Sequence, residues 1–218
     1  MTKEDIINMV HKYMSNLSNV RPGFAPLYHY LSEETDYFTA PASTKYHSSY
    51  EGGLAVHSYF VLKAFHTLFP KYGMENHDKV LMICLLHDLC KTNVYKEYYR
   101  NIKEYDKSKW PSDLGRGSIK KDKLGEFIWA QEKGYMFEDN FPYGHGEKSV
   151  LLAQRYIYLE QDEIFAIRYH MGPWQDGDKN NVSKVFEKYP LAFMLHMADG
   201  YATYILEPAF EVSLNGRN

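Results

Sequence analysis

The most marked pattern in the chain is an uninterrupted apolar run near its middle, from Val80 to Leu86. A run without glycine, proline or a polar side chain predicts a helix that is buried on most sides. It is too short to span a bilayer. His87 and Asp88 follow the run directly, and Lys91 lies three residues beyond Asp88. A buried helix that ends in an imidazole and a carboxylate predicts a site at that end, where other elements bring further groups.

Apolar residues at helical spacing predict further helices on both sides of this run. Thr2 and Asp5 form a capping-box-like start for the first helix, which Pro22 and Gly23 end. Other helices are predicted over residues 25–32, 54–68, 161–170, 182–189 and 191–206, and after Pro142. Residues 35–50 are predicted to form a loop, and loops of this length are often functional.

Residues 93–144 have a different pattern. The segment VYKEYYRNIKEY alternates and is rich in tyrosine, which predicts a strand, and YMFED is predicted to pair back onto it. The segment is rich in basic residues: Lys96, Arg100, Lys103, Lys107, Lys109, Arg116, Lys120, Lys121 and Lys123. Two interpretations stay open, a solvated hairpin insertion or a cationic flap over an anionic substrate.

Composition narrows the classes of protein to consider. A chain of 218 residues is long enough for one substantial core, and its net charge of -3 gives no sign of a general nucleic-acid binder. Cys84 and Cys90 fall in one predicted helix, so a bridge between them is not expected. The acidic start, MTKEDI, does not resemble a signal peptide. We therefore expect a soluble cytoplasmic protein that does not associate with membranes.

A set of histidines and aspartates carries the candidate chemistry. Each member lies on or beside a predicted helix: His57, His87, Asp88, His145, His170 and Asp199. Asp199 is the most informative, because apolar residues surround it and an ionised carboxylate in such a setting must be paired or bound to metal. Nitrogen and oxygen ligands suit one or two divalent ions of iron, manganese, nickel, cobalt or zinc.

The order of these residues resembles that of a known family. GGLAVH around His57 and LLHDLCK around His87 and Asp88, followed by Asp199, are similar to the HD-domain superfamily of metal-dependent phosphohydrolases. His145 in GHGEKS and His170 in RYHMG resemble the branch that holds two metals. The resemblance implies an all-α helical bundle, here with a small β-hairpin or flap inserted around residues 93–140. It implies a single domain over residues 1–218, with an N-terminal extension over 1–45, a core over 46–206 and the flap over 93–144.

The resemblance also implies a role for each residue. His57, His87, Asp88 and Asp199 would hold one metal, and Asp88 would bridge to a second that His145 and His170 also hold. A hydroxide between the metals would attack phosphorus. Asp88 and Lys91 would be catalytic, and Lys91 would also contact the phosphate of the substrate.

Two further residues are candidates for substrate binding. His47 lies in the long loop, and Lys148 stands at the start of a predicted helix.

The expected function is hydrolysis of a phosphoester, in a nucleotide or another small phosphorylated substrate. The approach sequence YHSSYEGGLAVH is also similar to that of HD-domain exonucleases, but the slightly negative charge ranks polynucleotides below mononucleotides. Two alternatives share the same ligands. One is a di-iron oxygenase of the HD fold, and the other is a metal-stabilised binding module without turnover.

Overall fold

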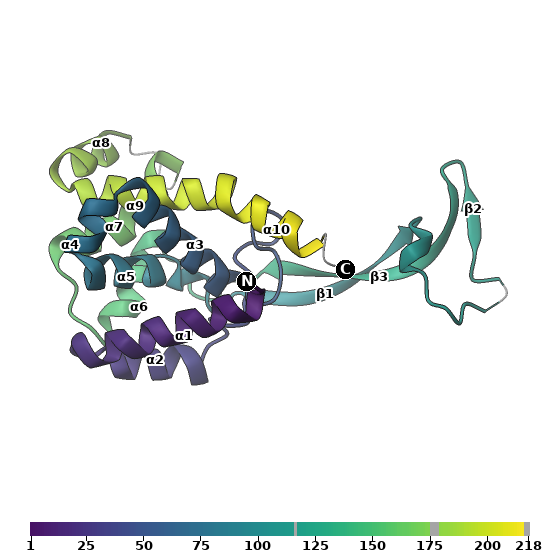
Figure 1. Ribbon diagram of the computed structural model, residues 1–218, viewed down its shortest axis with the longest axis horizontal. Helices are drawn as coiled ribbons and strands as arrows, with labels where there is room; N and C mark the ends of the chain where they lie inside the picture. The colour runs from purple at the N-terminus through teal and green to yellow at the C-terminus, as the bar shows by residue number, and fades with distance from the viewer. Residues whose placement is uncertain (116, 175–178, 216–218) are drawn as a thin grey trace.

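Two N-terminal helices begin the chain in the computed structural model, which describes residues 1–115, 117–174 and 179–215. Helix α1 (Lys3–Val20) starts at the predicted capping box, in which Thr2 and Asp5 each bond the other's backbone N–H. Its apolar face is buried, and α2 (Phe24–Glu33) returns alongside it (Figure 1). These two helices cover one side of the helical body.

The centre of the body is built from three packed helices, α3 (Gly53–Leu68), α5 (His77–Leu86) and α9 (Pro190–Tyr201). Helix α3 contacts both of the others, and the short α4 (Pro70–Glu75) links α3 to α5. The apolar run that ends at Leu86 is fully buried, as its composition predicts. Helix α5 ends at that residue, and a single 3-10 turn, η1 (Leu89–Lys91), follows.

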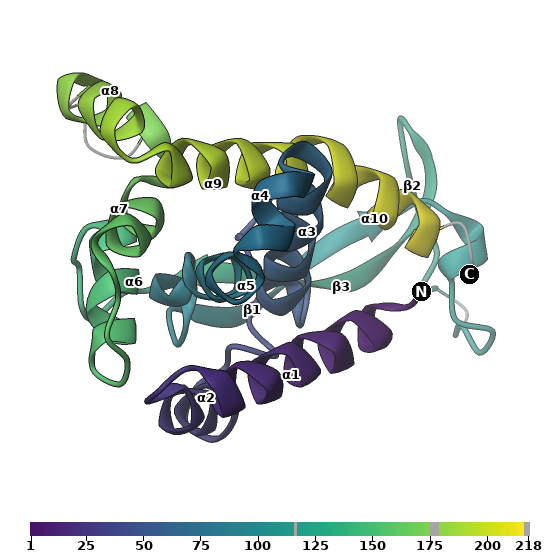
Figure 2. The ribbon, with the colours of Figure 1, turned by 60° about the vertical axis from the view of Figure 1, so that its left-hand side comes forward.

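The remaining helices close one side of this centre and extend the chain beyond it. Helices α6 (His145–Gln154) and α7 (Gln161–Tyr169) pack together, and α7 packs against α9 (Figure 2). A 3-10 turn, η3 (Gly172–Trp174), and α8 (Lys179–Lys188) follow α7. Helix α9 continues through a π-helical turn, η4 (Ala202–Leu206), into α10 (Glu207–Asn215). One long helix therefore runs across the body to the C-terminal end.

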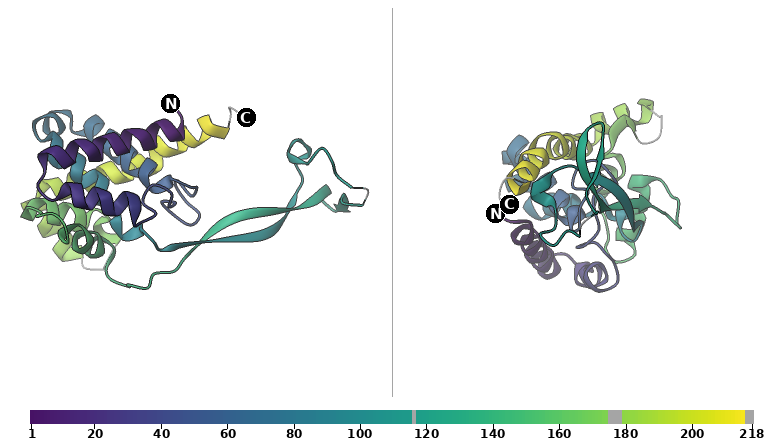
Figure 3. Two further views of the ribbon diagram at one scale, coloured as in Figure 1. Left: turned by 90° about the horizontal axis from the view of Figure 1, so that it is seen from below. Right: turned by 90° about the vertical axis from the view of Figure 1, so that its right-hand side faces the viewer.

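The strands form a long ribbon that projects from the helical body (Figure 3). Strand β1 (Tyr95–Glu104) pairs antiparallel with β3 (Gly125–Phe137), and β2 (Lys120–Asp122) pairs with the other edge of β3. A 3-10 turn, η2 (Lys107–Lys109), lies between β1 and β2. The prediction of an all-α fold is therefore wrong, because the protein is mixed, mostly helical with one three-stranded antiparallel sheet among its described residues.

Six of the described lysines and arginines of the insertion pair with carboxylates of the same insertion. Arg100 binds Glu132, and Lys103 binds Asp122 at 2.5 Å. Lys96, Lys107, Lys109 and Lys133 form further pairs of the same kind. Arg116 lies outside the described residues. These pairs are exposed and contribute little stability, but they satisfy the cations locally. The geometry favours a solvated insertion over a cationic flap.

Among the described residues, no helix combines the length and the apolar character that crossing a bilayer requires.

Candidate metal centre

Five segments, far apart in the sequence, converge at the end of α5. Asp88 follows this helix and is 2% exposed, and the chain around it is held by the turn η1. Helix α3 contributes His57, α9 contributes Asp199, and α6 begins at His145. The histidine after α7, His170, completes the group. The structure therefore brings together all six of the residues that the sequence offered as ligands, His87 included.

Four of these residues form a first group with the spacing of ligands around one cation. His57 Nε2 lies 3.2 Å from His87 Nε2, 3.2 Å from Asp199 Oδ1 and 3.5 Å from Asp88 Oδ2. His87 Nε2 lies 3.3 Å from Asp88 Oδ2. Ligand atoms at about 2.1 Å from a tetrahedral or octahedral ion are themselves roughly 3.0–3.4 Å apart. The donor atoms therefore fit a transition-metal ion between them.

The other oxygen of Asp88 forms a second group. Asp88 Oδ1 lies 2.8 Å from His145 Nε2 and 3.5 Å from His170 Nε2. His170 is fully buried, and its Nε2 makes no hydrogen bond. A buried ring nitrogen without a partner is costly unless it binds something else. This orphaned nitrogen, aimed at the carboxylate, supports a second ion that would share Asp88 with the first.

Backbone carbonyls fix the orientation of two ligand rings. His87 Nδ1 donates to the carbonyl of Cys84 at 2.8 Å, and His170 Nδ1 donates to the carbonyl of Ile167 at 2.7 Å. Each acceptor lies three residues earlier on the same helix. Because Nδ1 holds the proton, Nε2 presents its lone pair to the cluster, which is the form that binds a metal.

Burial and neighbouring charges shift the pKa values of the ligand residues in opposite directions. Burial opposes ionisation of Asp88, but Lys91 and then His87 hold its pKa well below the usual range. The pKa of Asp199 is lowered against burial by His57. Burial alone would lower the pKa of His57, but the carboxylate of Glu207 and then that of Asp199 raise it to about 10. In the metal-free protein, a proton on His57 therefore balances part of the carboxylate charge.

A cavity of about 550 Å³ adjoins the cluster. Asp88, His145 and Asp199 line it, so both groups of ligand atoms border a space that a substrate can enter. Lys91 also lines it, with Nζ 2.7 Å from Asp88 Oδ2. Apolar and aromatic side chains form much of the remaining wall: Tyr46, Met171, Tyr204 and Pro208.

The two further residues predicted to bind substrate, besides Lys91, differ in position. His47 lines the cavity, and its Nε2 is buried without a hydrogen bond. Burial lowers the pKa of His47 to about 4, so the ring is neutral at physiological pH. Lys148 is buried, and its Nζ lies 2.6 Å from Asp139 Oδ1. Lys148 is absent from the described lining of the cavity, and its role in substrate binding stays a prediction.

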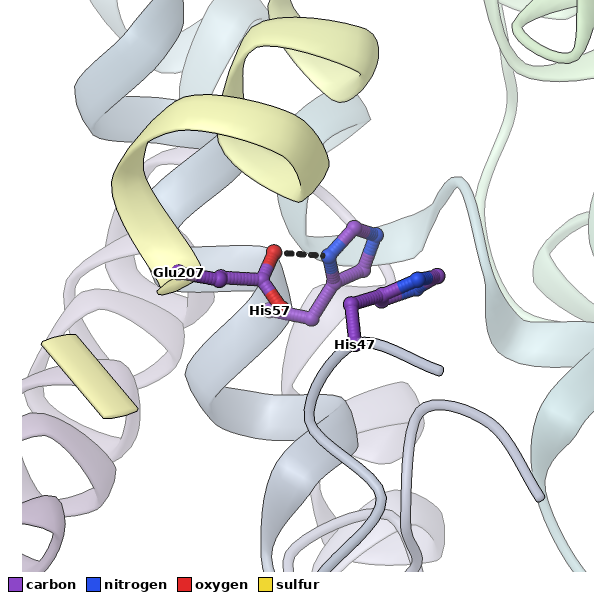
Figure 4. Close-up of side chains that lie close together, drawn as sticks. All are labelled: His47, His57 and Glu207. Carbon is purple, nitrogen blue, oxygen red and sulfur yellow. Dashed lines mark hydrogen bonds and ion pairs between the residues drawn. The ribbon is translucent and has the colours of Figure 1, made fainter. Parts of the chain in front are cut away.

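Two residues that contact the ligands were missed from the sequence. Glu207 Oε1 accepts a hydrogen bond from His57 Nδ1 at 2.7 Å (Figure 4). Cys90 Sγ lies 3.2 Å from His145 Nδ1, and burial raises the pKa of this thiol to about 12. Cys90 lies within the segment LLHDLCK and Glu207 lies outside the quoted motifs, and the resemblance assigns a role to neither. A carboxylate after a long apolar helix was the one available signal for Glu207.

Gly146 allows the helices that carry His145 and His170 to approach each other. A Cβ at this position would lie 2.2 Å from the carbonyl oxygen of Arg168, which is backbone and cannot rotate away. We expect Gly146→Ala to push α6 from α7, to separate the two histidines and to reduce the metal content by one ion per chain. Elemental analysis of the purified variant measures this loss.

The matched control for this prediction is Gly200→Ala. Gly200 follows Asp199 on α9, and a Cβ there meets nothing within 4 Å. The control should keep the metal content of the wild type. Equal metal content in Gly146→Ala would show that close approach of α6 and α7 is not required.

Comparisons with known proteins do not place the chain in a family. No protein-family model matches it, and neither does a curated protein or a solved structure. The resemblance to the HD-domain superfamily therefore stays a prediction.

Proposed function

We propose that the protein is a metal-dependent hydrolase of small phosphoesters. The observation that carries the proposal is the arrangement of two ligand groups around the two oxygens of Asp88, beside a cavity that Lys91 also lines. Divalent ions held there would supply Lewis-acid chemistry, which lowers the pKa of water and neutralises charge on a phosphoryl group. The chain's own contribution is to hold, orient and surround the reacting groups.

Lys91 is the residue that we assign to the phosphoryl group. Burial disfavours its charged form, but Asp88 raises its pKa above the ordinary value, so the side chain stays a cation. Its Nζ is close to Asp88 and its side chain is 14% exposed, which leaves it accessible from the cavity. It can donate a hydrogen bond to a phosphoryl oxygen and stabilise the charge that develops there.

The charges of the cavity favour a substrate with a single phosphate. Lys91 is the one lysine or arginine among the described residues that line it, whereas Glu207 and Glu211 add negative charge. A polyphosphate chain would meet these carboxylates without enough cations. Tyr46 and Tyr204, which are 83% and 79% exposed, offer rings against which a base or another planar group can stack. A nucleoside monophosphate or another small phosphomonoester fits this lining.

The test is reconstitution followed by a substrate panel. Protein stripped by a chelator is loaded separately with manganese, iron, nickel, cobalt or zinc, and phosphate release is measured from nucleotides and other phosphoesters. Turnover with at least one metal supports the proposal. If the metal-loaded protein releases no phosphate from any member of the panel but its iron form consumes oxygen, the proposal of a hydrolase is replaced by that of an oxygenase.

Replacement of Lys91 tests its assignment. We expect Lys91→Met to bind the same number of metal ions but to lose roughly 100-fold in kcat, because one charge-stabilising donor is removed. Steady-state kinetics and elemental analysis measure the two quantities.

Lys123→Met is the matched control for Lys91→Met, because Lys123 is an exposed lysine of the insertion. It should leave both quantities unchanged. A similar loss of kcat in both variants would favour the hypothesis that the insertion is a cationic flap over the substrate.

A further inference from the structure

Both oxygens of the Glu207 carboxylate accept hydrogen bonds. The residue is fully buried, Oε1 lies 2.7 Å from His57 Nδ1, and Oε2 accepts a hydrogen bond from Ser48 Oγ at 2.6 Å. Figure 4 shows the carboxylate beside the His57 ring, with His47 on the far side of that ring. A buried carboxylate that accepts a hydrogen bond from a candidate metal ligand can orient the ring of that ligand.

The orientation of the His57 ring depends on a residue distant in the sequence, unlike the orientation of the His87 and His170 rings. The rings of His87 and His170 are held by carbonyls of their own helices. His57 has its Nδ1 bonded to Glu207, which lies 150 residues later in the chain. Its Nε2 is the atom that meets His87 and Asp199. A 180° rotation of the ring about its Cβ–Cγ bond would put Cδ2 in the place of Nδ1 and Cε1 in the place of Nε2, so Nε2 would leave the cluster.

A π-helical turn explains how one helix supplies carboxylates to both nitrogens of His57. Asp199 and Glu207 are eight residues apart, and in a regular α-helix such residues point about 80° apart. The turn η4 lies between them and bonds the N–H of Glu207 to the carbonyl of Ala202, five residues back. It takes up one extra residue, which reduces the angle to about 20°. Both carboxylates therefore reach His57 on α3.

We propose that Glu207 is a positioning residue for the metal centre, placed by the π-helical turn so that its carboxylate fixes the His57 ring with Nε2 toward the metal. The inference rests on the metal site of the proposed function and adds an outer residue to it. Outer carboxylates of this kind orient the ring and increase its affinity for the cation, and their removal costs about 10-fold to 100-fold in metal affinity.

Ser48 links the same carboxylate to the loop that carries His47. The backbone φ of Ser48 is 45°, a left-handed conformation that is strained for a serine. Its N–H donates to Glu211 Oε1 at 2.9 Å while its hydroxyl donates to Glu207. Helix α10 therefore holds the loop at two points, and only the bond to Glu207 continues to His57. This difference provides a matched control within the same contact.

The experiment measures metal affinity rather than turnover. Chelator-stripped wild type, Glu207→Gln, Glu207→Ala and Glu211→Gln are titrated with zinc in competition with a chromogenic chelator. Glutamine can accept from Nδ1 and donate to Ser48, so it removes the charge and keeps the shape. We expect affinity to fall about 10-fold in Glu207→Gln and about 100-fold in Glu207→Ala, with Glu211→Gln within about 2-fold of the wild type.

A second readout separates positioning from a general loss of stability. Thermal melting of the metal-free proteins identifies any variant that has not folded. If Glu207→Ala does not fold, the comparison of wild type with Glu207→Gln is the test. In the zinc-loaded wild type, nitrogen NMR should show His57 protonated at Nδ1 and bound through Nε2. Binding of zinc through Nδ1, or equal affinities in wild type and Glu207→Gln, would overturn the proposal.

The proposed function can fail independently of this inference. Weaker zinc binding in the Glu207 variants, together with no hydrolysis by the wild type with any metal, would retain the positioning role and reject the phosphohydrolase. Hydrolysis by the wild type, together with zinc affinity that does not respond to Glu207, would do the reverse.

Discussion

Asp88→Asn should abolish both metal binding and hydrolysis. The two oxygens of Asp88 serve the two ligand groups, Oδ2 toward His57 and His87 and Oδ1 toward His145. An amide replaces one oxygen by a donor and removes the charge, so neither ion keeps its shared ligand. The transition state then loses several kcal/mol of charge stabilisation, which corresponds to a fall in kcat/KM of about 1000-fold or more. Elemental analysis and phosphate release measure the two losses.

The metal-free stability of this variant provides a second expectation. Lys91 Nζ lies 2.7 Å from the carboxylate and would lose its partner in a largely buried position. We therefore expect a lower melting temperature without metal, and no further decrease on addition of a chelator. Asp78→Asn, at an exposed position in the first turn of the same helix, is the control. Wild-type metal content in Asp88→Asn would contradict the shared-ligand arrangement.

The amphipathic helices were predictable because local signals specify them. The predicted capping box starts α1, and the buried residues Ile6, Val10, Met14 and Leu17 follow the period of a helix. Helix α7 was predicted over residues 161–170 and spans Gln161–Tyr169. In these segments, the apolar spacing and the end signals agree, so tertiary packing does not alter the result.

The ribbon was only partly predictable because neither of its faces is buried along its whole length. Strand β1 was recognised from its alternation, but β3 was placed too late and begins at Gly125. Phe127 and Ile128 are consecutive and both buried, which interrupts the alternation expected of a strand with one face in the core. Cross-strand pairing determines the extent of β3, and a pattern within one segment does not report it.

The six candidate ligands that converge could be named from the sequence, but the residues that support them could not. The ligands were chosen from the order of motifs, and their convergence depends on packing between α3, α5, α7 and α9. Glu207 was not predicted, because in a regular α-helix its side chain would point away from that of Asp199. The π-helical turn that realigns the two side chains has no sequence signal. The pairing of Lys148 with Asp139 could not be predicted, because Asp139 precedes the helix in an irregular segment.

The stability of the metal-free protein should decrease in alkaline solution, whereas the stabilisation by metal should increase. The groups that face His57 are Glu207, Asp199, Asp88, His87 and His47. Against the effect of burial, Glu207 and then Asp199 raise its pKa from 6.5 to about 10. Since the folded pKa is above the unfolded one, this stability is complete below about pH 6.5 and is lost as the pH rises toward 10. The loss is on the order of 4 kcal/mol, or roughly 10 °C in melting temperature.

The carboxylates produce the opposite limit. The pKa values of Asp88, Asp199 and Glu207 are lowered by their partners, so their contribution is present above the unfolded pKa of about 4 and is lost in acid. The metal-free protein should therefore be most stable between about pH 5 and 6.5. Melting curves from pH 4 to 9.5, recorded with a chelator, measure this profile.

Metal binding reverses the alkaline side of the profile because a cation and a proton compete for His57 Nε2. The difference in melting temperature between zinc-loaded and chelator-treated protein should be small at pH 5.5 and should grow toward pH 9. Glu207→Gln removes the charge that most raises the pKa of His57, so its metal-free melting temperature should fall less between pH 6.5 and 9.5. A wild type whose metal-free melting temperature is constant over that range would show that His57 is not the proton-binding group of the cluster.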